Sequence, residues 1–420
     1  MKPKYLLLIS ILFLLLTAIS PTSKESKSAD DFLQFWTDVK DNYAYFDKKH
    51  TDWDQVKTVY LPKAEKAKTR DELVTVFENA IEELYDNHFN LNTNLPSSTR
   101  LVPTGLDIWA EWINDKAIIT EVRKGFSADK AGIKSGMEIV SINGTPTDQA
   151  VNNRIGKCIN PIDIEAKNYA LKELLAGTYL TQRVLVVSQD GETNTIDLDK
   201  ESRNLTDHYK YKSLLESRTL DDNIGYIKIN NSVGETEIIQ LFDDALAQLK
   251  DTRGLIIDLR ETPSGGNSIV ARGILSRFTK VEMPYQKHVL PNEEKEFKIK
   301  RSWLEIVSPR GPFTYDKQVV VLVNHWTGSM SEGLTIGFSA LGKAKIVGTR
   351  MAGLNGAING FKTTRIEIPY SFPTEQLYHV NGTPRETFTP PYLIDLTDSK
   401  YKKIEDPILA EGINLMNEDK

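Results

Sequence analysis

The chain has 420 residues, of which 40% are hydrophobic and 26% are charged. A chain of this length and composition can bury a substantial core in two or three domains, so disorder is not the expected state. The formal net charge is -6. An acidic chain has no general attraction for phosphate groups, so we expect no nucleic-acid partner.

The first residues have the order of a secretory signal. Lys2 and Lys4 precede an apolar run at 5–19, and small residues follow at 20–23. We therefore predict a signal peptide at 1–22 and an exported protein, periplasmic or extracellular. Removal of this segment takes the net charge from -6 to -8. The alternative is an uncleaved membrane anchor, although a spanning helix usually needs about 20 apolar residues.

The cysteine and histidine residues of the sequence indicate which disulfides and metal sites are possible. The single cysteine, Cys158, has no partner for an internal disulfide. The six histidines are scattered, without a His-x-x-x-His spacing. The sequence therefore predicts neither a metal site nor another cofactor.

Residues 29–95 are predicted to form a helical region. Apolar side chains recur every three or four residues in two stretches. They are Phe32, Phe35, Trp36 and Val39, then Leu73, Val76, Phe77, Ala80, Ile81 and Leu84. The second helix is expected to end near Tyr85, and alternation at 89–92 predicts a strand. His88 is therefore expected at a helix-to-strand corner.

Residues 100–200 are predicted to form a β domain. Short strands are expected at 117–122 and 136–142, the second leading into the turn Asn143-Gly144. A later strand pair is expected at 183–187 and 193–198. A conspicuous helix start lies at 125–133.

Residues 210–400 repeat strand and helix. Strands are expected at 224–229, 254–259 and 318–323, and helices at 237–249, 268–278 and 331–341. The strands are almost continuously apolar, as in a sheet covered by helices on both faces. This region is predicted to be an α/β domain and to carry the chemistry.

Two loops at the carboxyl ends of these strands can hold reactive groups. Ser329 lies between a strand and a helix, whose free N–H groups can stabilise negative charge. The alternative is an N-cap serine. Gly265 and Gly266 allow backbone N–H groups to approach a ligand closely, although a simple tight turn has the same pattern. Both loops are expected side by side at one edge of the sheet.

Together these features resemble the S41 peptidases, the family of the tail-specific (C-terminal processing) proteases and the tricorn core protease. The resemblance runs from about residue 70 to about 395 and is carried by the segments 128–133, 258–266, 328–332 and 346–349. It implies a ClpP/crotonase-like α/β catalytic domain with an inserted PDZ-like β domain and an N-terminal helical cap.

The resemblance also assigns roles to residues. It implies a serine peptidase with Ser329 as nucleophile. The oxyanion donors would be the Met330 N–H and the turn at Gly265 and Gly266.

The general base separates two branches of the family. The Ser-Lys branch carries a lysine in a Gly-Lys-Gly segment, and the aligned residue here is Leu354, which cannot accept a proton. The tricorn-like branch uses histidine and glutamate, and its matching positions are His88 and Glu386. The resemblance implies His88 as base and Glu386 as its orienter, directly or through Asn87, which replaces that branch's serine. His325, four residues before the nucleophile, is the second choice.

The substrate is expected to be a polypeptide. Gly105, Leu106, Asp107 and Ile108 resemble the PDZ loop that receives a terminal carboxylate, although a β domain without a ligand is the alternative. We expect an exported endopeptidase that cleaves extended or unfolded chains recognised near their C-termini. The main alternative, kept open by Leu354, is a non-catalytic peptide- or ligand-binding protein with this fold. A carboxylesterase is a third, weaker candidate because the Gly-x-Ser-x-Gly pattern lacks its second glycine.

Overall fold

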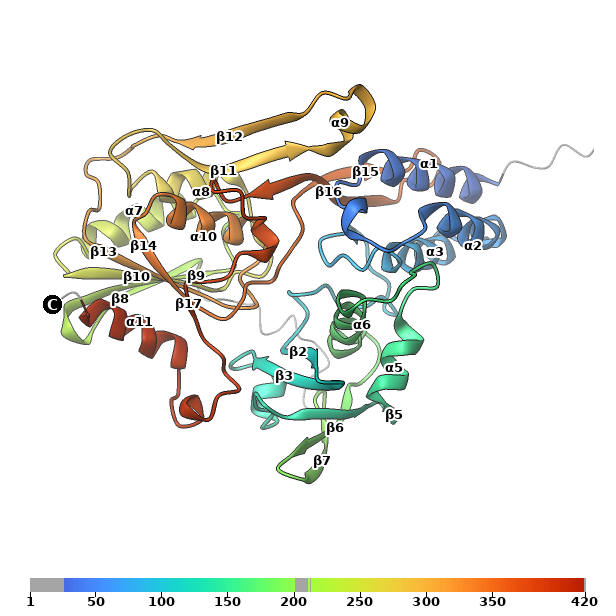
Figure 1. The fold of residues 1–420 in the computed structure, drawn as a ribbon, viewed down its shortest axis with the longest axis horizontal. Helices are drawn as coiled ribbons and strands as arrows, with labels where there is room; N and C mark the ends of the chain where they lie inside the picture. Colours follow the sequence, from blue (N-terminus) through green and yellow to red (C-terminus); the bar gives the residue numbers. More distant parts are fainter. Residues whose placement is uncertain (1–25, 201–210, 212, 419–420) are drawn as a thin grey trace, which may run out of the picture.

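The computed structural model describes residues 26–200, 211 and 213–418. The predicted signal peptide at 1–22 lies outside them. Within the described ranges, no helix is long and apolar enough to span a membrane. Figure 1 shows a large α/β part, a smaller β domain and a group of N-terminal helices.

The N-terminal helices lie where the apolar periodicity predicted them, with one more between the two. They are α1 (Lys27–Asn42), α2 (Trp53–Lys66) and α3 (Arg70–Glu82). Each begins at a side-chain cap, provided by Ser26, Asp52 and Thr69. Their buried apolar faces pack on Tyr370 and Phe372 of strand β16. The helical region is therefore continuous with the α/β part of the molecule.

The inserted β domain has strands in the order β2-β3-β4-β6-β7, with β5 paired to β4. The strands are β2 (Ile108–Ile113), β3 (Lys116–Val122), β4 (Glu138–Ile142), β5 (Thr145–Pro146), β6 (Val184–Gln189) and β7 (Glu192–Asp197). The helices are α4 (Ser127–Lys130), α5 (Thr147–Arg154) and α6 (Ile164–Ala176). The expected turn at Asn143-Gly144 follows β4, and both residues have positive φ.

The parallel sheet of the α/β part has six strands in the order β17-β14-β13-β10-β9-β8. They are β8 (Leu215–Leu220), β9 (Ile224–Asn230), β10 (Gly254–Glu261), β13 (Gln318–Val323), β14 (Ala344–Gly348) and β17 (Tyr392–Leu393). All neighbours are parallel except β8 with β9. The predicted strand and helix alternation is confirmed here.

Helices cover both faces of this sheet, which explains the continuous apolar strands. In Figure 1, α7 (Ile238–Gln248), α8 (Ser268–Leu275) and α10 (Met330–Ala340) lie on one face and α11 (Pro407–Asn417) on the other. Alternate residues of β10 belong to the two separate cores, since Ile257 packs with α7 and Ile256 with α11. The packed domain thus extends past residue 400, where the sequence suggested its end.

A second sheet of the α/β part lies over α10. Of its strands, only β1 corresponds to an element predicted from the sequence. Its order is β1-β16-β11-β12, with β15 paired to β16. The strands are β1 (Asn90–Leu91), β11 (Met283–Leu290), β12 (Arg301–Val307), β15 (Ala357–Lys362) and β16 (Pro369–Tyr378), and α9 (Pro291–Phe297) joins β11 to β12. This sheet faces the start of α10 and forms one wall of the site described next.

Candidate active site

Ser329 lies in the sharp turn from β13 into α10. Its φ is 52° and its ψ is -116°, a backbone conformation that is strained for a residue with a side chain. The Ser329 N–H donates to Oε2 of Glu332 at 2.7 Å. The turn therefore has the strained geometry of a nucleophile elbow, although the second glycine of the usual motif is absent.

Glu332 ties this turn to the segment that carries Leu354. Its two carboxylate oxygens also accept the N–H groups of Gly353 at 2.9 Å and Leu354 at 3.3 Å. Burial raises the pKa of Glu332 to about 7, although the Arg385 charge and these backbone donors act in the opposite direction. The two segments are thus held together at the buried base of the site.

The glycine turn lies directly against the elbow, as expected. A Cβ built on Gly265 would lie 2.4 Å from Ser329 Cβ and 2.9 Å from the Met330 nitrogen. Gly265 also has a φ of 65°, which favours glycine. At Gly266 a Cβ would lie 2.1 Å from the backbone carbon of Val233. Side chains are excluded from this turn, and its backbone lies against Ser329 and the first N–H of α10.

His88 lies at the corner between α3 and β1. Its backbone N–H donates to Asp86 Oδ1 at 2.9 Å, and its ring Nδ1 lies 2.5 Å from the carbonyl oxygen of Asn355. Because a carbonyl can only accept, this contact places the ring proton on Nδ1 and leaves Nε2 as an acceptor. Burial, and then the charge of Arg385, lower the pKa of His88 to about 4. The ring is therefore neutral at neutral pH, which is the form a general base needs.

Two parts of the chain match known protein families. The sequence model described as "Peptidase family S41" matches residues 223–388, and "Tricorn protease C1 domain" matches 25–82. The chain is 24% identical to the carboxyl-terminal-processing protease of Picosynechococcus sp. over 82% of its own length and 78% of the relative's. It is 25% identical to the carboxy-terminal processing protease CtpA of Bacillus subtilis, over 68% of this chain and 55% of that protein.

Residues 223–388 therefore match the S41 peptidase family, and the protein is a serine-type peptidase.

Solved structures agree at the level of the fold. The chain matches mature CPAF with a TM-score of 0.61 and 16% identity, covering 94% of this chain and 99% of that one. The photosystem II D1 C-terminal processing protease matches with a TM-score of 0.54 and 16% identity, covering 89% and 95%. The expected mixed α/β fold is therefore confirmed.

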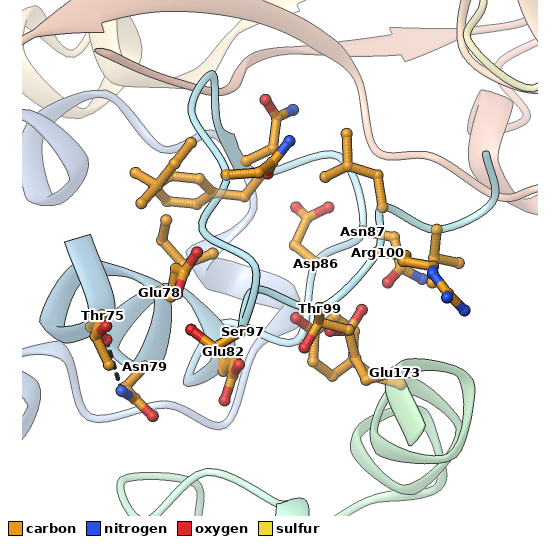
Figure 2. A pocket seen from close by; sticks show the side chains of 18 of the residues that line it. Thr75, Glu78, Asn79, Glu82, Asp86, Asn87, Ser97, Thr99, Arg100 and Glu173 are labelled. Atoms are coloured by element: carbon orange, nitrogen blue, oxygen red, sulfur yellow. Dashed lines mark hydrogen bonds between the residues drawn. The ribbon is translucent and has the colours of Figure 1, made fainter. Parts of the chain in front are cut away.

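Among the described residues, the side chains of Glu386 and Asn87 form no hydrogen bond with the His88 ring. Glu386 Oε2 accepts from the Tyr45 hydroxyl at 3.5 Å, and burial raises the pKa of Glu386. Asn87 lines a separate cavity of about 210 Å³ between α3 and α6, where its Oδ1 is buried without a hydrogen bond (Figure 2). Among the described residues, neither hydrogen-bonds His88, and no hydrogen bond joins His88 to Ser329.

Arg385 links several parts of the site. Its guanidinium donates to the carbonyl oxygens of Leu354 at 3.0 Å and Gly356 at 2.7 Å. It therefore fixes the backbone on both sides of Asn355, whose carbonyl holds His88. Arg385 and Gly356 also line the same cavity as Ser329. The segment around Leu354, which bears the base in the Ser-Lys branch, serves here as the support of a histidine.

His325, the second-choice base, is directed toward the inserted domain. Its Nδ1 lies 2.6 Å from Glu121 Oε2, and its ring stacks on Trp109 with centroids 4.5 Å apart. The next residue, Trp326, is fully buried and donates its indole N–H to the Leu106 carbonyl at 2.7 Å. His325 thus belongs to the contact that anchors the elbow loop to the inserted domain, and it does not line the cavity at Ser329.

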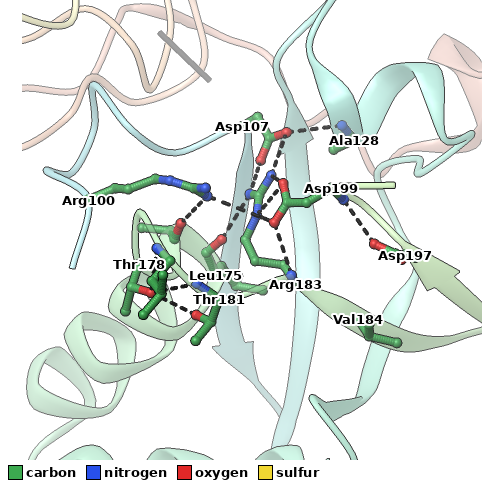
Figure 3. A network of polar contacts seen from close by, with 12 residues as sticks. Arg100, Asp107, Ala128, Leu175, Thr178, Thr181, Arg183, Val184, Asp197 and Asp199 are labelled. Carbon is green, nitrogen blue, oxygen red and sulfur yellow. Dashed lines mark hydrogen bonds and ion pairs between the residues drawn. The ribbon is translucent and has the colours of Figure 1, made fainter. Parts of the chain in front are cut away.

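The predicted peptide-binding loop at Gly105, Leu106, Asp107 and Ile108 is firmly anchored. Asp107 is fully buried and pairs with Arg183 at 2.5 Å (Figure 3). The Gly105 and Leu106 N–H groups already donate to carbonyls earlier in the same loop. A terminal carboxylate would have to displace these bonds.

The cavity at Ser329 also contains residues that the sequence did not single out. They are Gln286, His288, Trp303, Glu305 and Glu375, from strands β11, β12 and β16. The sequence holds a weak signal for part of this group, because Trp303, Glu305 and Val307 alternate along β12 as on one face of a strand. These residues are far from Ser329 along the chain, so the sequence alone does not predict that they lie near it.

Proposed function

We propose that this S41 peptidase is an endopeptidase in which His88 activates Ser329. The carrying observation is the contact between His88 Nδ1 and the Asn355 carbonyl, because it leaves Nε2 free to take the serine proton. Leu354 is buried beside the elbow and donates only its backbone N–H, so no lysine is available at that position. These observations support the histidine-dependent branch of the family.

The proposed reaction is acyl transfer. Ser329 Oγ attacks the peptide carbonyl while His88 takes its proton, and the oxyanion forms beside the Met330 N–H and the turn at Gly265 and Gly266. His88 then protonates the leaving amine, and a water molecule hydrolyses the acyl-enzyme with His88 again as base. Glu386 is the proposed orienter of the imidazolium, and it exchanges its Tyr45 contact for His88 when substrate closes the site.

The proposed substrates are extended or unfolded polypeptides recognised near their C-termini. The names of the two curated relatives, both carboxyl-terminal processing proteases, support this proposal. The inserted domain is the proposed PDZ-like module, and its edge strand β2 is the proposed docking edge. Asn168 of α6 accepts the Trp112 N–H of β2 at 2.7 Å, so a docking strand would take over this bond. Export remains our prediction from the segment 1–22.

Cleavage of casein by the mature chain tests the proposal. We expect the wild type to cleave it, and Ser329→Ala and His88→Ala to be inactive while folded. Activity of His88→Ala would reject the assigned base. Inactivity of every form, with retained peptide binding, would favour a binding protein that has kept the peptidase fold.

A further inference from the structure

The cavity beside Ser329 has a volume of about 370 Å³ and lies mainly between two parts of the fold, the elbow and the second sheet. The elbow contributes Ser329 and Met330, and the second sheet contributes the opposite wall through β11, β12 and β16. A side chain of a substrate bound at Ser329 would enter this cavity. The groups on the sheet wall therefore decide which side chains the peptidase accepts.

Two carboxylates on this wall share one imidazole. His288 Nδ1 lies 2.8 Å from Glu375 Oε2, and His288 Nε2 lies 3.1 Å from Glu305 Oε2. Burial alone would lower the pKa of His288, but these bonds outweigh it and hold the pKa above its ordinary value. Even with His288 protonated, the three side chains together carry one negative charge.

The remaining cations do not neutralise Glu375. Arg272 lies 3.6 Å from Glu305, and its side chain is 44% exposed, so solvent screens that pair. Arg385 donates to the carbonyls of Leu354 and Gly356, and its charge acts on the carboxylates of Glu332 and Glu386. Among the described residues, Glu375 forms no ion pair with lysine or arginine, and its side chain is 20% exposed. Its carboxylate therefore keeps acceptor capacity that a ligand can reach.

A further residue of the wall has unmet hydrogen-bonding capacity. Gln286 is 2% exposed, and among the described residues its Oε1 accepts no hydrogen bond. Buried polar atoms in native proteins are rarely left in this state. A wall of this kind is expected of a polar site that an occupant completes.

The rest of the cavity suits an alkyl stem. Trp303 is 37% exposed and stacks on His288 with ring centroids 4.7 Å apart, while Met330 and Leu377 are buried apolar neighbours. The guanidinium carbon of Arg301 lies 5.7 Å from the Trp303 ring centroid, so a cation already approaches this indole. The cavity thus combines an apolar surface near the nucleophile with acceptors on the sheet.

We propose that this cavity receives a basic side chain of the substrate, lysine or arginine, next to the cleaved bond, with Glu375 and Glu305 as the specificity-determining residues. This inference rests on the proposed endopeptidase function. It adds a substrate class to it, because an acidic side chain would be repelled by the same carboxylates and a neutral one would leave them unpaired.

The test uses one unstructured host peptide whose cleavage site has been mapped by mass spectrometry. Lysine, norleucine or glutamate is placed on either side of the cleaved bond. For the wild type we expect kcat/KM to be about 10- to 100-fold higher for lysine than for norleucine on one side of the bond, and lowest for glutamate. Glu375→Gln should remove this preference by lowering kcat/KM for the lysine peptide at least about tenfold. Glu405→Gln, which neutralises an exposed carboxylate paired with Lys124 outside the cavity, should retain the preference.

Binding separates this inference from the proposed function. The Ser329→Ala protein should bind the lysine peptide more tightly than the norleucine peptide, and Glu375→Gln in that background should abolish the difference. Selective binding without cleavage by the wild type would support the basic pocket and reject the peptidase proposal. Cleavage with equal kcat/KM for lysine and norleucine, or a preference that Glu375→Gln leaves intact, would overturn the pocket and leave the peptidase in place. Thermal unfolding of each variant checks that it is folded.

Discussion

The His88 imidazole and the Asn355 carbonyl are in direct contact, although 267 positions separate them in the chain. The contact fixes the ring with its proton on Nδ1. Asn355 is in turn held by Asp86, whose Oδ2 accepts from the Asn355 side chain at 2.9 Å. A backbone carbonyl thus contacts His88 at Nδ1, the ring nitrogen that a carboxylate contacts in a Ser-His-Asp triad.

Asp86 is expected to act as a positioning residue for His88. In Asp86→Asn, the amide N–H group cannot replace the oxygen that accepts from both Asn355 and Tyr43. We expect kcat to fall about tenfold, equivalent to one lost hydrogen bond to a charged group, with KM little changed. Loss of the Asp86 charge also lowers the pKa of His88 further, so the acid limb of the pH profile should shift to lower pH.

The matched control for this change is Asp54→Asn. Asp54 is an exposed carboxylate paired with Lys40 on the helical surface. Wild-type rates in Asp86→Asn, or an acid limb displaced to higher pH, would contradict the positioning role.

Backbone strain at Ser329 predicts a gain of stability at the expense of activity. Glycine adopts a positive φ without strain, so Ser329→Gly should raise the free energy of unfolding by about 1 kcal/mol. Ser329→Ala keeps a Cβ and should not gain this stability. Both variants should be inactive. Equilibrium denaturation in urea compares them, and equal stabilities would argue against stored strain at the elbow.

The glycine turn is predicted to be intolerant of a side chain. The Cβ of Gly265→Ala would meet Ser329 Cβ and the Met330 nitrogen, so the elbow must move. We expect a loss of stability of about 1–3 kcal/mol and a loss of kcat of at least about a hundredfold. Gly360→Ala, on β15, is the control because the nearest atom would lie 3.8 Å away, at the flexible end of Ser371. A nearly wild-type rate for Gly265→Ala would exclude this turn from the oxyanion site.

Much of the α/β sheet could be predicted because each strand is an apolar run followed by a turn signal. β10 and β13 are examples, and the helices after them begin close to the expected residues. The second sheet could not be predicted in the same way. Its strands contain Pro284, Pro369 and Pro373, and they alternate polar with apolar residues because one face lines the cavity.

The residues of the candidate site also divide into those that the sequence could predict and those that it could not. Ser329 and the glycine turn follow strands that are neighbours in the sheet, so their proximity follows from topology. The contact of His88 with Asn355 depends on tertiary packing of the helical region against β16, which no local pattern encodes. His325 illustrates the reverse case. It is close to Ser329 in sequence, but Trp109 and Glu121 hold its ring against the inserted domain.

The pKa values predict two opposite effects of pH on stability. The folded-state pKa of His88, about 4, lies below the unfolded value of about 6.5. The unfolded chain therefore binds the extra proton between these values, and this contribution to stability is lost as pH falls from about 6.5 toward 4. Glu332 has a folded-state pKa of about 7, above its unfolded value, so its contribution is lost as pH rises from about 4.5 to 7.

Urea denaturation at several pH values separates the two groups. His88→Ala should remove the rise in the free energy of unfolding that His88 contributes between pH 5 and 6.5. Glu332→Gln should remove the opposing fall in the free energy of unfolding that Glu332 contributes as pH rises. The same His88 pKa predicts that kcat/KM has an acid limb near pH 4 and is flat from there to neutrality. An acid limb at pH 6.5 would show that the catalytic base is not buried as His88 is.

The rate at which a fluorophosphonate modifies Ser329 tests the central claim most directly, because it measures activation of the nucleophile without a choice of substrate. The adduct is located by mass spectrometry in the wild type and in His88→Ala, His325→Ala and His288→Ala. We predict rapid labelling of Ser329 in the wild type, a loss of at least about a hundredfold in His88→Ala, and rates within a few-fold of the wild type in the other two. Labelling of His88→Ala at the wild-type rate, or its loss only in His288→Ala or His325→Ala, would contradict the account.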